Sequence, residues 1–507
     1  MMKKVIKKLL AALLAVAMVC AMAIPAFAFE SWETKEDLNK NHDYIAFQIF
    51  KGVISSKDNP ALSGVTWGSH ITNPDDFLKK LKDAPIIGAQ FQSIDATDAT
   101  DAATVQKVLA VISKWHDSDD DSIAFARFVC HYLYSNGAAP DSDIVGGNSS
   151  ITIPEAGYYL IVDTINFSNG DYYHAYNSFL LVNVPQAVQT SYNVTINHKV
   201  VKPTVEKKVY DNFDNQDGTS TGDFGSSADH AINEKFQFQL IAKLPAGRDE
   251  GRAYDYYDKY TVCFNDTLSE GITYDKLDSV VINSNGHTYD ITNDTSKYTI
   301  TESQNSFVVK IPDVKTCAEG LDLNDGATIT VTYTAHLNEN ATVNTVSSDT
   351  KNNNSVYLQY SNNPRINTSV GQTPESKVCV YTYQLNNTKH QDSENGPVLE
   401  GAGFRLYSDK ACTPEQEVKL YKKDNFYYPI KDATDKAQDA VEMFSDEHGQ
   451  FNVKGLDAGT YYLKETKTPA DYNPCDVPPV IIKANHKGNQ VDLNGSTLST
   501  TIINNKA

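Results

Sequence analysis

The chain has 507 residues, of which 40% are hydrophobic, and a formal net charge of −20 at pH 7. This acidic balance argues against nucleic acid and anionic membranes as partners, because their phosphates would repel the chain. At about 150 residues per domain, the length predicts about three domains, each large enough for a hydrophobic core.

Residues 1–28 have the pattern of a secretory signal peptide. Four lysines lie within the first eight residues, an apolar run follows over residues 9–24, and Ala26-Phe27-Ala28 provides a small-residue cleavage site. We therefore expect export of a mature chain that begins at Phe29. After the signal, no apolar run of the sequence has the length needed to span a bilayer.

Residues 29–198 form the first predicted domain. Runs of apolar residues predict a strand near its start and another after residue 156, and three stretches between them have apolar residues at helical spacing. The predicted strands cover residues 44–50 and 157–163, and the predicted helices cover residues 75–82, 102–116 and 122–134. This domain is predicted to be a β-sandwich with a helical insertion.

Residues 199–374 and 378–507 form the second and third predicted domains. Both contain short runs of β-branched and aromatic residues, separated by Asn, Asp and Gly turns. This pattern is typical of immunoglobulin-like sandwiches. The predicted fold class is therefore mainly β, with three tandem immunoglobulin-like β-sandwich domains, the first of which carries the helical insertion.

The third domain has a lysine on its first strand, a glutamate on a middle strand and an asparagine on its last strand. These residues are Lys389, Glu465 and Asn504, with Asn505 as the alternative to Asn504. If they meet in the core, burial lowers the pKa of the lysine and raises that of the glutamate. The neutral amine can then attack the asparagine side-chain carbonyl, assisted by the acid. The expected product is an intramolecular Lys–Asn isopeptide bond, formed once per chain. This chemistry indicates a mechanical protein, not an enzyme with a substrate.

Six cysteines remain after signal cleavage, and they are widely spaced without a Cys-x-x-Cys pair. No zinc site is therefore predicted, and no other metal or cofactor motif is found. In an exported chain, Cys412 with Cys475 and Cys263 with Cys317 are candidate disulfides. Free buried thiols remain the alternative.

The run Gly459-Thr-Tyr-Tyr-Leu-Lys-Glu-Thr resembles the E-box of collagen-adhesin B-type domains of Gram-positive surface proteins, with Glu465 as its acid. In the second domain, residues 204–209 resemble the opening strand of the A-type domains of the same group, and the run that begins at Asn354 is similar to their asparagine-donating strand. That resemblance implies a bond between Lys207 and Asn354, with Asp266 as the assisting acid and Lys208 as the alternative nucleophile.

The whole mature chain resembles sortase-assembled backbone pilins. Residues 194–199 are similar to the pilin motif, which implies that Lys199 accepts the next subunit from a pilin-specific sortase, although Asn197 and His198 replace the usual tyrosine and proline. Lys202 is the competing acceptor. Because resembling proteins continue into a Leu-Pro-x-Thr-Gly sorting signal, we expect one beyond Ala507. The alternative is a secreted protein that is never linked.

The resemblance implies that this chain is the shaft subunit of a covalently polymerised pilus at the surface or cell wall of a Gram-positive bacterium. Its partners would be neighbouring pilin subunits. The alternative is a monomeric adhesin whose stiffened domains form a stalk and whose first domain binds a host or glycan ligand.

Overall fold

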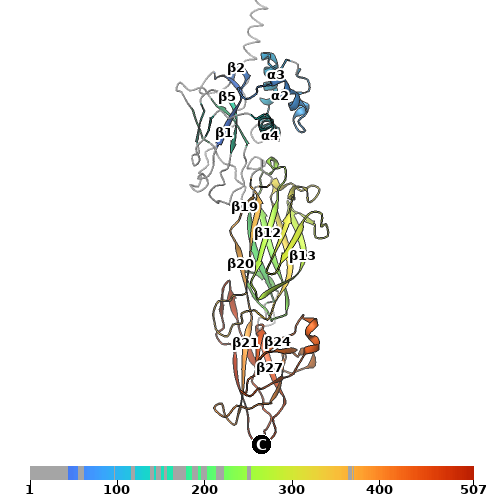
Figure 1. Cartoon of the computed structure of the whole chain (residues 1–507), viewed down its shortest axis with the longest axis vertical. Helices are drawn as coiled ribbons and strands as arrows, with labels where there is room; N and C mark the ends of the chain where they lie inside the picture. The colour runs from blue at the N-terminus through green and yellow to red at the C-terminus, as the bar shows by residue number, and fades with distance from the viewer. Residues whose placement is uncertain are drawn as a thin grey trace, which may run out of the picture.

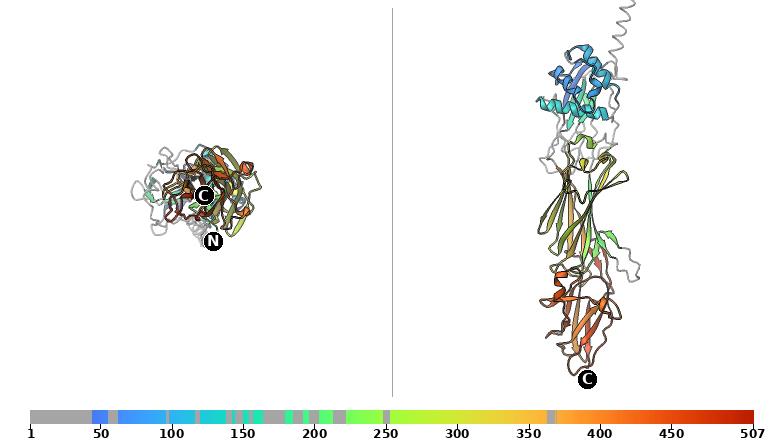
Figure 2. Two further views of the ribbon diagram at one scale, coloured as in Figure 1. Left: turned by 90° about the horizontal axis from the view of Figure 1, so that it is seen from below. Right: turned by 90° about the vertical axis from the view of Figure 1, so that its right-hand side faces the viewer.

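The computed structural model describes residues 44–54, 62–95, 98–115, 120–137, 142–143, 150–153, 157–163, 179–184, 192–195, 203–212, 222–247, 253–362, 368 and 370–507. The predicted signal peptide and both candidate acceptor lysines, Lys199 and Lys202, lie outside these residues. Within the described part of the chain, no helix is long and apolar enough to cross a membrane. Three units follow one another along the long axis of the molecule, with the helix-containing unit at one end and the C-terminus at the other (Figures 1 and 2).

The first unit is a sheet covered by helices. Its elements are β1 (Tyr44–Ile54), β2 (Leu62–Trp67), α2 (Pro74–Lys82), η2 (Gly88–Phe91), α3 (Ala102–Ile112), α4 (Asp120–Ser135), β3 (Ser142–Asp143), β4 (Ser150–Ile153), β5 (Gly157–Asp163), β6 (Phe179–Val184) and β7 (Tyr192–Thr195). The main sheet has the order β2-β1-β5-β6, with β3 paired to β1, and β4 pairs separately with β7.

The predicted helices of the first unit are present and bury the predicted apolar faces. Asn73 caps α2 by accepting a hydrogen bond from the Asp76 amide (3.1 Å), and Pro74 fits the first turn because that turn needs no amide donor. Helix α3 buries Val105, Val108, Leu109 and Ile112. The helices therefore cover this sheet with apolar side chains.

The middle unit is a sandwich of two sheets. Its elements are β8 (Thr204–Asp211), β9 (Asp223–Gly225), β10 (Ser227–Asp229), β11 (Lys235–Leu244), η4 (Ala253–Tyr256), β12 (Val262–Leu268), β13 (Ile272–Ser284), β14 (His287–Asp290), β15 (Thr299–Ser303), β16 (Ser306–Ile311), η5 (Val314–Thr316), η6 (Leu323–Asp325), β17 (Ala327–Leu337), β18 (Asn353–Ser361), β19 (Val370–Gln372) and β20 (Ser376–Tyr381). One sheet has the order β14-β13-β17-β11-β8-β9, and the other has the order β10-β20-β18-β12-β16-β15, with β19 on β18.

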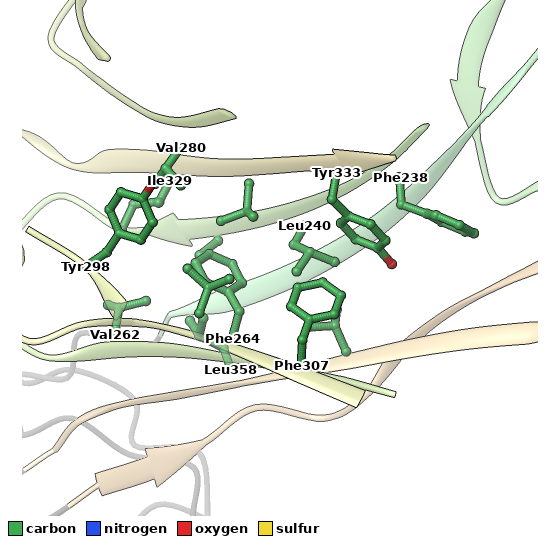
Figure 3. Packing of buried hydrophobic residues seen from close by; sticks show 14 of the residues in the cluster. Phe238, Leu240, Val262, Phe264, Val280, Tyr298, Phe307, Ile329, Tyr333 and Leu358 are labelled. Carbon is green, nitrogen blue, oxygen red and sulfur yellow. The ribbon is translucent and has the colours of Figure 1, made fainter. Parts of the chain in front are cut away.

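The core of the middle unit lies between these two sheets. Along β11, every second residue is buried, from Phe236 to Leu244, as expected for a strand with one face on a core. Figure 3 shows Leu240 and Tyr333 pointing from one sheet toward Phe264 and Phe307 of the other.

The middle sandwich extends beyond the boundary predicted at residue 374. Strand β20 pairs with β18 and β10 of this unit, and Val378 and Val380 are buried in its core. The two valines alternate inward and cover the end of the core, so this segment is a strand and only Thr382 separates it from the next unit.

The C-terminal unit is a smaller sandwich. Its elements are β21 (Tyr383–Gln391), β22 (Gly403–Tyr407), η7 (Pro414–Gln416), β23 (Leu420–Lys423), β24 (Phe426–Pro429), η8 (Thr434–Asp439), β25 (Met443–Phe444), β26 (Asn452–Leu456), β27 (Gly459–Lys467), β28 (Val480–Ile482), β29 (Asn485–Lys487), β30 (Gln490–Asp492) and β31 (Ser499–Asn504). Its sheets have the orders β23-β24-β26-β21-β31 and β25-β22-β27-β28, and β29-β30 is a separate hairpin. The predicted mainly β fold is confirmed.

The middle and C-terminal units pack closely against each other. The Ile232 amide donates a hydrogen bond to the Gly455 carbonyl (2.9 Å), and Asn233 Nδ2 donates to the Pro429 carbonyl (2.8 Å). Gly455 has a φ of +86°, and a Cβ added there would lie 2.5 Å from the Ile232 side chain. Only glycine therefore fits at this point of close approach.

Candidate crosslinking sites

In the middle unit, Lys207, Asp266 and Asn354 converge between the two sheets. Lys207 lies on β8, opposite Leu240 of β11, whereas Asp266 and Asn354 lie on the paired strands β12 and β18 of the facing sheet. All three are buried. Lys208, the alternative nucleophile, points away from the core and lies 3.6 Å from Glu206 on the outer face.

A tyrosine hydroxyl connects the three side chains. Lys207 Nζ contacts Asp266 Oδ2 and donates to the Tyr333 hydroxyl (3.0 Å). That hydroxyl donates to Asp266 Oδ1 (3.3 Å) and accepts a hydrogen bond from Asn354 Nδ2. One donor and two acceptor positions of the phenol are thus in use.

The surroundings of this cluster favour neutral side chains. Burial lowers the pKa of Lys207 to about 8, although Asp266 opposes the shift, and burial raises the pKa of Asp266. The rings of Phe238 and Tyr333 have their centroids 5.4 and 5.3 Å from Lys207 Nζ. Asn354 Oδ1 is buried and has no hydrogen-bond partner among the described residues. A neutral amine is therefore far more accessible here than at an exposed lysine.

In the C-terminal unit, Lys389, Glu465 and Asn504 also converge. Strands β21 and β31 are parallel neighbours that place Lys389 beside Ile502 and Gln391 beside Asn504, and β27 of the other sheet carries Glu465. The side chains of Lys389 and Glu465 are 0% and 2% exposed. Asn504 is fully buried, whereas Asn505, its alternative, is exposed.

The two carboxylate oxygens of Glu465 face different groups. Glu465 Oε1 lies 3.8 Å from Lys389 Nζ, and Oε2 accepts a hydrogen bond from Asn504 Nδ2 (3.2 Å). Asn504 Nδ2 also donates to the Asn473 carbonyl (2.7 Å), which orients the amide. Oε2 is held in addition by the Cys475 amide and the Thr468 hydroxyl, each at 3.0 Å. The acid is therefore fixed between the amine and the amide nitrogen.

Burial lowers the pKa of Lys389, and the neighbouring Cys475 and Glu465 only partly offset this shift. The Phe404 ring lies 5.7 Å from Lys389 Nζ. Asn504 Oδ1 and Glu465 Oε1 are buried without a hydrogen-bond partner in the described structure. Such groups cost about 1–3 kcal/mol each, so this site holds its reactive groups at some expense of stability.

The two candidate disulfides are not formed. The four cysteines of these two pairs have free thiols. Cys475 Sγ accepts a hydrogen bond from Lys389 Nζ (3.3 Å), while Cys412 lies in a turn with a φ of +52°. Cys317 donates to the Asp313 carbonyl (3.5 Å), and Cys263 contacts Asn265 on its own strand. Each thiol thus contacts groups other than its predicted partner.

Sequence reasoning did not find Tyr333 or the contact of Cys475 with the lysine. Tyr333 follows Ile329 and Val331 in the alternation of β17, so the pattern could place it in the core. Nothing local could show that its hydroxyl meets Lys207, because that contact depends on the order β17-β11-β8 within one sheet. Its contacts with Asp266 and Asn354 depend on how β17 faces β12 and β18 of the other sheet.

The fold and these sites define a class: tandem β-sandwiches with a buried lysine, carboxylic acid and asparagine in two successive units. A family model described as the SpaA prealbumin-like fold domain matches residues 385–497. A search of curated proteins gives no match.

Among solved structures, the T6 backbone pilin of serotype M6 Streptococcus pyogenes, described as a modular three-domain structure, is 14% identical and has a TM-score of 0.51, covering 93% of this chain and 97% of its own. The 35 kDa C-terminal fragment of the major pilin GBS80 of Streptococcus agalactiae is 22% identical, covers 60% of this chain and 99% of its own, and has a TM-score of 0.41. The full-length major pilin SpaD from Corynebacterium diphtheriae is 19% identical, covers 73% of this chain and 83% of its own, and has a TM-score of 0.43. The likeness to the T6 pilin extends over nearly the whole chain and concerns the fold.

Proposed function

We propose that this protein is the shaft subunit of a covalently polymerised surface pilus, and that its middle and C-terminal units each form an intramolecular Lys–Asn isopeptide bond. The observation that carries the proposal is the recurrence of one arrangement in two separate sandwiches. In each, a buried carboxylate contacts a buried lysine and reaches a buried asparagine, directly in the C-terminal unit and through the Tyr333 hydroxyl in the middle unit. The fold shared with the T6 backbone pilin supports the same conclusion.

In the C-terminal unit, Glu465 would transfer the proton between amine and amide. Oε1 takes a proton from the Lys389 ammonium, and the neutral amine attacks the side-chain carbonyl carbon of Asn504. Glu465 then protonates Asn504 Nδ2, which Oε2 already contacts. A new N–C bond replaces the C–N bond of the amide, and ammonia leaves. The Glu465 carboxylate then takes the second proton from the attacking nitrogen, which leaves a neutral amide and a protonated acid. No oxidant or cofactor is needed.

In the middle unit, the same transfer would pass through Tyr333. Asp266 contacts Lys207 Nζ directly but reaches Asn354 Nδ2 only through the tyrosine hydroxyl. The phenol would donate its proton to the leaving nitrogen and recover one from Asp266. Burial keeps the pKa of Tyr333 well above its ordinary value, so the phenol stays protonated until the amide nitrogen takes its proton.

The position of the C-terminal bond suits a load-bearing fibre. Force would enter this unit at β21 and leave it after β31, and these are its first and last strands. Because the two strands are neighbours, a bond between Lys389 and Asn504 would carry the tension directly. The rest of the sandwich would then be shielded from the pull.

The intact mass of the purified mature chain tests the bonds. We expect a mass lower than that of the sequence by two molecules of ammonia, and a deficit of one ammonia after Asp266→Asn. Lys208→Ala is the matched control, since this lysine lies on the same strand but faces outward, and it should retain both bonds. A wild-type mass equal to that of the sequence would refute crosslinking.

Polymerisation is tested separately from the internal bonds. A pilin-specific sortase should link wild-type chains into a ladder, and Lys199→Ala should abolish the ladder while the mass deficit of each chain persists. An unchanged ladder would reject Lys199 and direct the test to Lys202→Ala. If neither variant changes the ladder, or if no ladder forms, the monomeric adhesin is the better description.

A further inference from the structure

The junction between the middle and C-terminal units holds a buried histidine that faces two carboxylates. His230 and Glu234 lie in the loop after β10 of the middle unit, and Asp457 follows β26 of the C-terminal unit. One ligand atom from each of the three lies within 4.8 Å of the other two. His230 is fully buried, Asp457 is buried, and the Glu234 side chain is 14% exposed.

One ring nitrogen of His230, Nδ1, makes no hydrogen bond within the described structure and can serve as a metal ligand. His230 Nε2 donates a hydrogen bond to the Tyr210 carbonyl (2.7 Å), and the ring stacks on Phe236 with centroids 4.0 Å apart. His230 Nδ1 is buried and has no hydrogen-bond partner in the described structure. Its nearest carboxylate oxygen, Glu234 Oε1, is 3.6 Å away, which is too far for a good hydrogen bond. In the neutral ring, a lone pair on Nδ1 therefore faces a carboxylate, and a cation between them would relieve the repulsion.

The carboxylates of this group are held in place. Glu234 Oε1 accepts a hydrogen bond from Asn212 Nδ2 (3.0 Å) and Oε2 accepts one from the Ala231 amide (3.2 Å), while Asp457 Oδ1 accepts one from the Ala458 amide (2.8 Å). Glu234 Oε2 also lies 3.5 Å from Lys431 Nζ. Carboxylates held by hydrogen bonds and a histidine whose other nitrogen donates to a backbone carbonyl are characteristic of metal ligands.

A second histidine group at the same junction makes an informative contrast. His486 Nε2 lies 3.3 Å from Asp211 Oδ2 and 3.6 Å from Asp229 Oδ1, and its Nδ1 contacts Ser227 Oγ (2.9 Å). The two aspartates raise the pKa of His486 to about 9 against the effect of burial. This imidazole therefore carries its own positive charge at neutral pH, and both ring nitrogens have partners. The group needs no other cation.

We propose that His230, Glu234 and Asp457 form a binding site for a divalent transition metal, Zn²⁺ by the nature of its donors, which joins the middle and C-terminal units. Imidazole nitrogen with carboxylate oxygens suits Zn²⁺, whereas Ca²⁺ takes six to eight oxygen ligands. Tetrahedral Zn²⁺ has bonds of about 2.0–2.1 Å to its ligand atoms. Two ligand atoms around it would lie slightly closer to each other than the 3.6 Å that separates His230 Nδ1 from Glu234 Oε1. A small contraction would therefore complete the site. The bound metal would brace the contact between Ile232 and Gly455 and stiffen the joint between the two sandwiches.

Zinc binding by the untagged mature chain, stripped with a chelator, tests this site. Titration calorimetry with zinc chloride at pH 7.5 should show one saturable site per chain, and calcium chloride should show none. His230→Gln and Asp457→Asn should each abolish the saturable step. His486→Gln should retain it, as should His336→Gln, whose histidine pairs with Asp275 (2.8 Å) inside the middle unit.

Cobalt provides a second readout that does not depend on the variants. Co²⁺ bound to the wild-type chain should give visible absorption bands of a four- or five-coordinate site, and Zn²⁺ should displace it. The proposal is overturned if the wild-type chain takes up no Zn²⁺, or if His230→Gln and Asp457→Asn bind it like the wild type. Binding lost in His486→Gln but retained in His230→Gln would also overturn it, by placing the metal in the other group.

Discussion

Removal of the Tyr333 hydroxyl should slow formation of the middle bond without preventing the fold. In Tyr333→Phe, Asp266 still contacts Lys207, but Asn354 Nδ2 loses its hydrogen-bond partner and its link to the acid. Loss of a positioned acid–base group typically lowers a rate by about 10²- to 10⁴-fold. The unpaired buried groups should also destabilise the fold by about 1–3 kcal/mol. We therefore expect a fraction of chains that lack the middle bond long after synthesis.

Mass spectrometry of freshly purified protein over time measures this effect. Wild-type chains should show the full two-ammonia deficit, whereas Tyr333→Phe should begin with a one-ammonia deficit and approach two slowly. Tyr260→Phe is the matched control, because that hydroxyl is buried in the same core without a hydrogen-bond partner among the described residues. Equal rates for Tyr333→Phe and wild type, at equal folded fractions, would refute a role for the phenol as proton relay.

Three further predictions concern the C-terminal unit and the junction. Glu465→Gln should leave the C-terminal unit folded but without its bond. Its free energy of unfolding should fall by about 4–5 kcal/mol, by analogy with a disulfide that closes a loop of about 100 residues. Denaturant melts measure the loss of stability and intact mass measures the bond, and an unchanged mass deficit would contradict the prediction. Cys475→Ser should still form the Lys389–Asn504 bond, because the thiol only accepts a hydrogen bond from Lys389. The number of reactive thiols titrated in the denatured mature protein should fall from six to five. Loss of the isopeptide bond in this variant would mean that the sulfur is required. For His486, the folded pKa of about 9 lies above the ordinary 6.5, so its stabilisation is complete below about pH 6.5 and is lost as pH rises through 9. Melts between pH 6 and 10 should show a loss of up to about 3 kcal/mol in the wild type that is absent from His486→Gln, and parallel curves would contradict it.

Local sequence patterns were sufficient to place the reactive residues on the correct faces of their strands. Successive side chains of a strand point to opposite faces, so Lys207 shares the inner face with Val209 while Lys208 lies outside. The same alternation separates buried Asn504 from exposed Asn505. The helices of the first unit and the mainly β class were likewise predictable, because they depend on the period of the apolar residues.

The contacts between sheets and between units were decided only by the tertiary structure. Tyr333 meets Lys207 because β17 and β8 flank β11 in one sheet, and it meets Asp266 and Asn354 because the other sheet faces that one. Cys475 lies beside Lys389, and not beside Cys412, because its loop passes over the C-terminal site. Strand β20 belongs to the middle sandwich because it pairs with β18 and with β10, and β10 lies far from it in sequence. Within the described residues, His230 and Asp457 come together only because one unit packs on the other. Alternation reports which side of a strand a residue occupies, but it carries no information about what lies opposite, and the chemistry of these sites depends on that partner.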